Sequence, residues 1–341
     1  MKFEAQTISV RFVQALLASV IRRPDYDPAW VSNVGLAPEL LSLQGTRITM
    51  EKFAELYRAL AIQMDDETLG FFSRPLRNGT LKYLCLSMLS APALRVALNR
   101  FCNFYRLIND DVLFEVSHAQ GGLVRIALHE RNDLGASRVL ALELMLMLVQ
   151  GVSSWMIARK IPFVRITFPF DRPAHAAEYD HLYPGPVFFN EPVTALYMDA
   201  AYMYEPIRQD QISLRRFLRN APMNWFYFLD TERPYTHKVR SYLQERLEEG
   251  VNVEQAAHAL HLSARTLARR LADEGSSFQR IKDALRRDLA VELLDKTREP
   301  VASIAQTLGF EDATAFNRAF RQWTGSAPGV YRKRPAVRTY R

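Results

Sequence analysis

Apolar and polar positions follow two different periods along the chain, which separates a mixed first part from a helical last part. Residues 7–110 are predicted to be mostly helical, with the clearest helical spacing at residues 9–23, 49–63 and 91–109. An alternating, β-branched pattern in residues 112–130 predicts a β-hairpin. Short strand-like runs, separated by proline and glycine, follow in residues 163–199. The first part is therefore predicted to be α+β.

One long apolar run lies between the hairpin and the later strands. The run at residues 139–157 is apolar enough to raise the question of a membrane span, but it holds Glu143 and Gln150. A carboxylate inside a bilayer is expensive. We therefore predict a helix that is buried on most sides within a globular domain, and no membrane association.

The last hundred residues contain an internal repeat. Residues 253–271 match residues 301–320 at an offset of 48 in their first halves and 49 in their second halves. The later offset makes Arg269 equivalent to Arg318. Because the extra residue falls where a turn is expected and the pattern then resumes in phase, we interpret the two segments as copies of one helix-turn-helix unit.

Each copy carries its own start and turn signals. Asn252 and Ser263 are predicted N-caps in the first copy, and Asp312 is the corresponding cap in the second. Gly309 is predicted to make the turn of the second copy, because glycine accepts positive φ freely. His261 holds that position in the first copy, and histidine tolerates positive φ better than most residues do.

A single helix is predicted between the copies, at residues 277–297. It would span roughly 30 Å, and one turn of B-DNA is about 34 Å. A rod of that length could place two recognition helices in successive major grooves. A plain helical bundle needs no such spacer, so the length favours DNA binding.

Charge is distributed unevenly along the chain. Residues 207–341 hold 24 Lys and Arg against 16 Asp and Glu, whereas residues 1–206 hold 20 against 21. The basic excess therefore lies wholly in the last part and favours a polyanionic partner, with nucleic acid ahead of an anionic membrane. A solvated basic face is the alternative. The two cysteines, Cys85 and Cys102, and the absence of a secretory signal at the first residues favour a reducing cytoplasm.

The second copy carries the pattern Ile-Ala, Gly-Phe, Phe-x-Arg-x-Phe and Gly-x-x-Pro-x-x-Tyr-Arg within residues 300–332. With it, residues 235–332 resemble the C-terminal DNA-binding domain of AraC/XylS-type bacterial transcription regulators. Residues 15–205 resemble the arabinose-binding-type N-terminal domain of one branch of that family, through "LSAPALRVALNRFCNFYRLIND" and "YPGPVFFN".

The resemblance implies an α+β N-terminal sensor domain and an all-α C-terminal domain of two helix-turn-helix motifs joined by a long helix. We predict an effector-binding and dimerisation domain in residues 1–205, a linker in residues 206–234, a tandem helix-turn-helix domain in residues 235–334 and a basic tail in residues 335–341.

The family reads base edges with the exposed face of each second helix, which implies contacts by Arg265, Thr266, Ala268, Arg269, Ala313, Thr314, Asn317 and Arg318. Arg265 and Arg269 are one turn apart and could reach guanine together, and Asn317 could read adenine. Family members often carry a longer polar residue where Ala268 stands, so this position is expected to touch at most a thymine methyl group. Phosphate contacts, or merely solvated charges, are predicted at Ser263, Lys282, Arg286, Arg287 and Arg321.

A small effector is expected in the N-terminal domain, and its lining is predicted at Tyr83, Leu84, Met88, Phe104 and Tyr105, with ordinary core packing as the alternative. The expected partners are double-stranded DNA, a second copy of the chain and, for an activator, RNA polymerase. No cofactor, metal site or catalytic residue is expected. The remaining alternatives are a constitutive regulator whose N-terminal domain only dimerises, and an enzyme with a basic DNA-binding tail.

Overall fold

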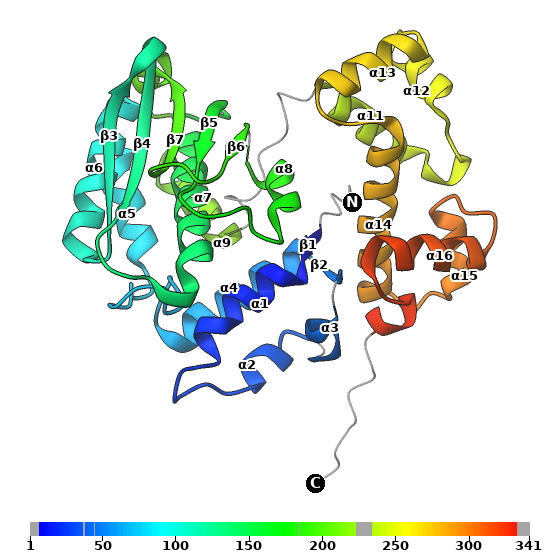
Figure 1. Ribbon diagram of the computed structural model, residues 1–341, viewed down its shortest axis with the longest axis horizontal. Helices are drawn as coiled ribbons and strands as arrows, with labels where there is room; N and C mark the ends of the chain where they lie inside the picture. The colour runs from blue at the N-terminus through cyan, green and yellow to red at the C-terminus, as the bar shows by residue number, and fades with distance from the viewer. Residues whose placement is uncertain (1–6, 37, 44, 184, 223–233, 333–341) are drawn as a thin grey trace. The chain divides into compact units, whose positions relative to one another are not determined.

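The computed structural model describes residues 7–36, 38–43, 45–183, 185–222 and 234–332 (Figure 1). The chain divides into two compact units, each assembled from separate stretches of sequence. The sheet unit comprises Arg11–Trp30 and Ala54–Leu229, and the repeat unit comprises Met1–Val10, Val31–Phe53 and Asp230–Arg341. The predicted basic tail, residues 335–341, and residues 223–233 of the predicted linker lie outside the described residues.

A five-stranded sheet of order β3-β4-β7-β5-β6 forms the centre of the sheet unit. Its neighbours pair antiparallel except β5 and β6, which pair parallel. The predicted hairpin is confirmed, and its turn places Gly121 and Gly122 at φ 73°. The strands are β3 (Val112–Ala119), β4 (Leu123–Glu130), β5 (Phe163–Thr167), β6 (Val187–Phe188) and β7 (Thr194–Asp199).

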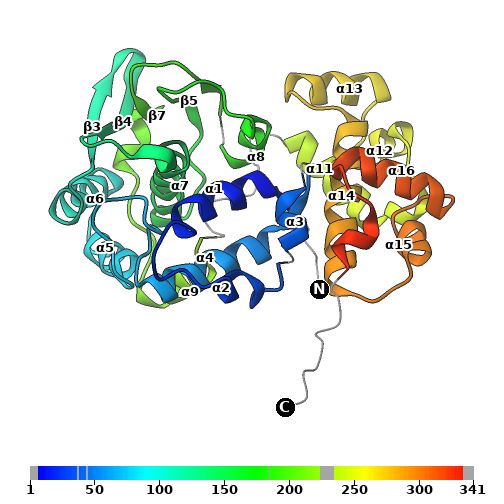
Figure 2. The same ribbon diagram turned by 60° about the horizontal axis from the view of Figure 1, so that its bottom comes forward.

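Helices α6 and α7 of the sheet unit lie against this sheet, and Figures 1 and 2 both show α6 beside β3. Helix α7 lies against β7 and is buried at every position from Leu140 to Ser154. The segment Gly135–Met156 is long and apolar enough to cross a membrane by length and composition, yet it is a core helix here, as predicted. The helices are α1 (Val10–Val20), α4 (Met50–Met64), α5 (Thr80–Leu89), α6 (Leu94–Ile108), α7 (Arg138–Met156), α8 (Tyr179–Leu182) and α9 (Gln211–Asn220).

The repeat unit is organised along one long helix. Figure 1 shows α12 and α13 at one end of α14 and α15 and α16 at the other. The single connecting helix predicted from the sequence is therefore confirmed. The helices of the unit are α11 (Pro234–Glu245), α12 (Val253–Ala259), α13 (Ala264–Asp273), α14 (Phe278–Lys296), α15 (Val301–Thr307) and α16 (Ala313–Thr324), with the short α2 (Ala29–Ser32) and α3 (Pro38–Ser42) from earlier in the chain.

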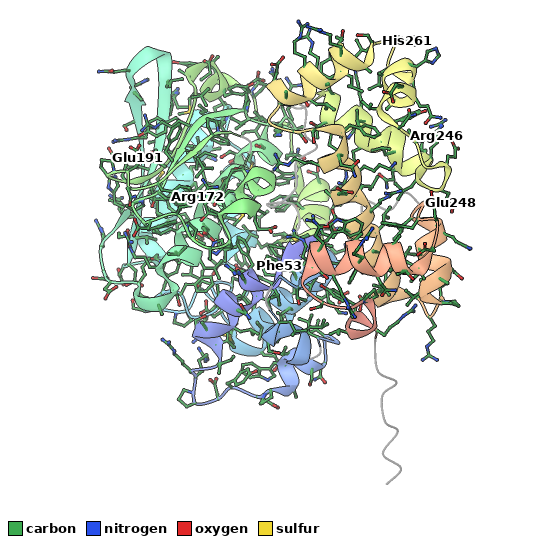
Figure 3. The ribbon with its side chains drawn as sticks, turned by 45° about the vertical axis from the view of Figure 1, so that its right-hand side comes forward. Phe53, Arg172, Glu191, Arg246, Glu248 and His261 are labelled. Atoms are coloured by element: carbon green, nitrogen blue, oxygen red, sulfur yellow. The ribbon has the colours of Figure 1, made fainter. Side chains whose placement is uncertain are left out.

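The two copies share the same turn geometry. After α12 the amide of Leu262 donates to the carbonyl of Ala257 at 2.9 Å, and after α15 the amide of Phe310 donates to that of Ala305 at 2.9 Å. His261 has φ 56° and Gly309 has φ 70° at the equivalent left-handed position; Figure 3 shows His261 on the surface of the first turn. Both helix ends therefore close with the same hydrogen-bonded motif.

The prediction that residues 7–110 are mostly helical missed a small ribbon. Strand β1 (Thr7–Ser9) pairs antiparallel with β2 (Arg47–Thr49), placing Ile8 opposite Ile48. Two isolated strands are at best marginally stable in water. This ribbon is buried against α14 and belongs to the repeat unit, so the DNA-binding motifs are supported by residues from the start of the chain.

Candidate nucleic-acid interface

The second helix of each copy has one buried and one exposed face. Leu267 and Leu271 anchor α13, and Phe316 and Phe320 anchor α16; all four are completely buried. Their i, i+4 spacing fixes one stripe of each helix in the core, so the opposite stripe must face solvent. These faces are the surfaces that a helix-turn-helix presents to a major groove.

The N-caps set the two helices in the same register. The side chain of Ser263 accepts the amide of Thr266, and the side chain of Asp312 accepts the amide of Ala315. Counted from these caps, Arg269 and Arg318 are each the sixth residue of their segment. The inserted residue therefore lies between the turn and the cap of the second copy, where it leaves the helix register unchanged.

Three guanidinium groups on these faces have no hydrogen-bond or ion-pair partner among the described residues. Arg265, Arg269 and Arg318 are exposed, and among the described residues no carboxylate or carbonyl pairs with any of them. An unpaired guanidinium retains all five N–H donors, in the planar arrangement that matches guanine or a phosphate. Recognition of one guanine by such a group is worth about 1–3 kcal/mol of discrimination.

The other predicted base-reading positions differ in exposure and in hydrogen bonding. Ala268 and Thr314 are exposed, whereas Thr266 and Ala313 are half-buried. The Asn317 amide nitrogen donates to the carbonyl of Ala313 at 2.7 Å. Reading an adenine requires both the amide donor and the amide acceptor, so Asn317 would have to release this helix bond to do so.

Most of the predicted phosphate contacts already have interior partners. Lys282 donates to the carbonyl of Val251 at 2.6 Å, and Arg286 donates to that of Gly309 at 2.7 Å. Burial lowers the pKa of both side chains. Arg287 pairs with Asp288 at 3.0 Å. These three cations therefore hold the repeat unit together, and a phosphate would have to share donors that are already in use.

Ser263 and Arg321 complete the predicted phosphate set. Ser263 is exposed and its hydroxyl lies 2.8 Å from that of Thr266, so it serves first as the cap of α13. Arg321 is exposed one turn beyond Arg318 on α16. A backbone phosphate beside the major groove is within reach of such a position.

A buried carboxylate ties α14 to the ribbon. Asp288 accepts a hydrogen bond from the Thr7 hydroxyl at 2.6 Å and pairs with Arg240 at 3.4 Å. Burial alone would raise the pKa of Asp288, but the charges of Arg287, Arg240 and Arg47 outweigh it, and the pKa lies below its usual range. The ionised carboxylate therefore stabilises the junction between α14 and the start of the chain.

Further contacts of the ribbon and of the first turn of α4, which follows it, were not foreseen from the sequence. The Arg47 amide donates to the Tyr331 hydroxyl at 3.0 Å, and Lys52 pairs with Asp295 of α14. Lys296 at the end of α14 pairs with Glu51. The only local signal was a short β-branched run next to Thr49, which is too brief to predict a strand or its distant partners.

The predicted effector lining is not gathered on one surface. Leu84, Met88 and Tyr105 are buried in the sheet unit, where Tyr105 packs 5.0 Å from the Phe114 ring of β3. Tyr83 is 62% exposed, and Phe104 is half-buried. The first three residues therefore serve as core packing of α5 and α6, and the lining role stays a prediction.

Comparison with known proteins covers both parts of the chain. Residues 28–207 match the family described as the arabinose-binding domain of AraC transcription regulator, N-terminal, and residues 256–334 match a helix-turn-helix domain family. An ornithine utilization regulator of Pseudomonas aeruginosa is 27% identical over 337 residues, covering 98% of this chain and 99% of its own. The regulator VqsM of the same species is 33% identical over 95 residues, covering 28% of this chain and 29% of its own.

Among solved structures, the transcriptional regulator CdpR of Pseudomonas aeruginosa is 18% identical, covers 95% of this chain and 97% of its own, and has a TM-score of 0.32. The family matches span the chain from the sheet unit to the second helix-turn-helix copy. This chain belongs to the AraC family of DNA-binding transcription regulators and carries an arabinose-binding-type N-terminal domain.

Proposed function

We propose that the chain binds double-stranded promoter DNA through both copies at once, with Arg269 and Arg318 as the main base-reading residues. The observation that carries the proposal is their equivalent position, six residues after each cap, where both side chains are exposed and neither pairs with another of the described residues. Helix α14 has 19 residues between the copies, a length of about 28 Å. That length suits two successive major grooves on one side of the duplex, about 34 Å apart.

We further propose that a small effector bound in residues 1–205 controls this binding. The ribbon supports a physical route, because β1 runs directly into α1 and β2 runs directly into α4. The residues after Val10 and Phe53 belong to the sheet unit. A ligand that shifts either helix would therefore pull on the strands packed against α14, and it acts by the difference in its affinity for the two states.

The remaining elements of the proposal are a cytoplasmic homodimer without catalytic activity of its own, which contacts RNA polymerase if it activates transcription. One relative's name refers to ornithine utilization, so ornithine belongs in any panel of trial effectors. A constitutive regulator whose sheet unit only dimerises is the alternative. A panel of metabolites that leaves both thermal stability and operator affinity unchanged would favour that alternative.

The DNA-contact assignment is tested by replacing both arginines, Arg269→Ala and Arg318→Ala, in the full chain. The matched control is Arg95→Ala with Arg106→Ala, which removes the same charge from exposed positions of α6 in the sheet unit. Binding to the mapped operator and to a scrambled duplex is measured by fluorescence anisotropy. The recognition variant should lose its preference for the operator, and the control should keep it. Equal operator affinity in both variants would contradict the assignment.

A further inference from the structure

Helix α7 carries a carboxylate in the core of the sheet unit. The Glu143 side chain is completely buried, and its Oε1 accepts a hydrogen bond from the Tyr179 hydroxyl. The same oxygen lies 2.6 Å from Nε2 of His175. The other oxygen, Oε2, has no hydrogen-bond partner among the described residues. Oε1 of Glu143 therefore has two hydrogen-bond partners, whereas Oε2 is a vacant acceptor with none among the described residues.

A second vacant acceptor lies on the same face of α7. Gln150 is seven residues further on, two helical turns or about 10 Å along the axis. Its Nε2 donates to the carbonyl of Leu182 at 3.3 Å, while its Oε1 has no partner among the described residues. Buried polar atoms are nearly always paired, because an unpaired one loses its hydration without compensation. The oxygen of an ionised carboxylate and an amide oxygen both accept, so a group that meets these two atoms is a donor.

Aromatic rings cover this face of α7. Tyr179 lies 5.3 Å from the ring of Tyr183 and 5.6 Å from that of Phe189. Arg172, which is exposed, lies over the Phe189 ring at 5.8 Å. Aromatic faces attract cations, and the Phe189 ring already holds one. We call the rings the aromatic cluster; its members are Phe168, Phe170, Tyr179, Tyr183 and Phe189.

We propose that Glu143 anchors the effector and that the effector is an aliphatic amine, whose ammonium group donates to Oε2 beneath the aromatic cluster. This inference rests on the proposed function and specifies its ligand. An ammonium group supplies three donors and the charge that a buried carboxylate needs. Among the described residues no Lys or Arg pairs with Glu143. A second donor on an extended amine would reach Gln150.

His175 is the entry side of this site. Its side chain is 11% exposed, whereas Glu143 is fully enclosed and Tyr179 is 2% exposed. An ammonium group that reaches Glu143 replaces the His175 contact. The ring of His175 also lies 4.6 Å from that of Phe12 in α1. Displacement of His175 therefore acts on the helix that continues from the β1 ribbon strand.

The test uses the full chain and measures binding by calorimetry and thermal stability. The probes are putrescine and agmatine, and the uncharged comparator is butanediol, which has the four-carbon chain of both probes but no ammonium group. The variant Glu143→Gln keeps the shape and the acceptor for Tyr179 but removes the charge. The matched control is Glu115→Gln, because Glu115 also pairs with a histidine, His129, at 2.7 Å, but on the surface.

At least one amine should raise the melting temperature of the wild-type chain, and its uncharged comparator should not. Glu143→Gln should weaken that amine at least tenfold, and Glu115→Gln should not change it. If Glu143→Gln does not fold, the variant Tyr179→Phe tests the site instead. This change removes the hydroxyl that donates to Oε1 and so frees a lone pair for the amine. A higher amine affinity supports the site, and an unchanged affinity contradicts it.

Any of four results would overturn the inference. If no amine on the panel binds, water rather than a ligand meets the vacant oxygen. If an amine binds Glu143→Gln as tightly as wild type, its site lies elsewhere. A neutral metabolite that shifts operator affinity in both Glu143→Gln and wild type would refute the amine but leave effector control standing. If no compound changes the operator affinity, both the amine ligand and effector control are refuted.

Discussion

Gly309 offers a sharp test of the second turn. Its φ is +70°, and a Cβ at this position would lie 2.3 Å from the carbonyl oxygen of Leu247 and 3.1 Å from Nη2 of Arg286. The carbonyl belongs to the backbone and cannot rotate away. The substitution Gly309→Ala therefore carries two costs, one from backbone conformation and one from steric overlap.

The structure supplies a control that separates these costs. Gly275 has φ +72°, and a Cβ there would meet nothing within 4 Å. Gly275→Ala therefore pays only the left-handed conformation, about 1–2 kcal/mol. Gly309→Ala adds overpacking of about 1–3 kcal/mol. The difference between the two variants isolates the contact with Leu247.

Thermal unfolding followed by far-ultraviolet circular dichroism measures that difference. For a unit of this size, 1 kcal/mol corresponds to about 2–4 °C in Tm. Gly309→Ala should therefore melt at least about 2 °C below Gly275→Ala. Equal melting temperatures would mean that the second turn does not pack against Leu247 and would refute the geometry given for it.

Three further changes probe the repeat unit. His261→Gly should raise the free energy of unfolding by about 0.5–1 kcal/mol in urea titration, because it relieves a left-handed residue but adds glycine's entropy; a loss of stability would contradict this. Tyr331→Phe removes the acceptor of the Arg47 amide and should cost about 0.5–1.5 kcal/mol; unchanged stability in the same titration would count against the bond. The pKa of Asp288 is lowered in the folded chain, so its stabilisation is full above about pH 3.8 and is lost as the pH falls further. The melting temperature should therefore fall less steeply for Asp288→Asn than for the wild-type chain between about pH 5 and about pH 2, and parallel profiles would contradict the assignment.

The repeat was predictable because its signals are local. The caps at Ser263 and Asp312 and the turns at His261 and Gly309 each lie within a few residues of the helices they bound. Local signals of this kind can be recognised in the sequence without knowledge of the fold. The change of offset from 48 to 49 was informative for the same reason, because an insertion between turn and cap leaves each helix intact.

The ribbon was not predictable, because what stabilises it is distant in sequence. Thr7 pairs with Thr49 and donates to Asp288, which is 281 residues away. Strands of three residues are too short to show a period. The phosphate predictions met a related limit, since composition cannot distinguish a free cation from Arg286, which lies over the Phe310 ring at 4.5 Å and donates to a carbonyl.

Part of the candidate effector site could be predicted from the sequence, and part could not. The sequence alone showed a glutamate in the middle of an apolar run, where burial of its charge costs free energy. The structure adds that Oε2 of Glu143 has no hydrogen-bond partner among the described residues. The rings that cover it come from residues 168–189, where the described residues form a short 3-10 turn and the four-residue α8. Such irregular segments carry little periodic signal, so no pattern could have placed them over α7.

The most direct measurement is a hydroxyl-radical footprint on the mapped operator, made with wild type, Arg269→Ala and Arg318→Ala. Two copies joined by a rod of about 28 Å predict two protected segments about 10 base pairs apart on one face of the duplex. Each single variant should weaken a different segment. One continuous or single protected segment, or the loss of the same segment in both variants, would contradict the reading of DNA by two equivalent helices.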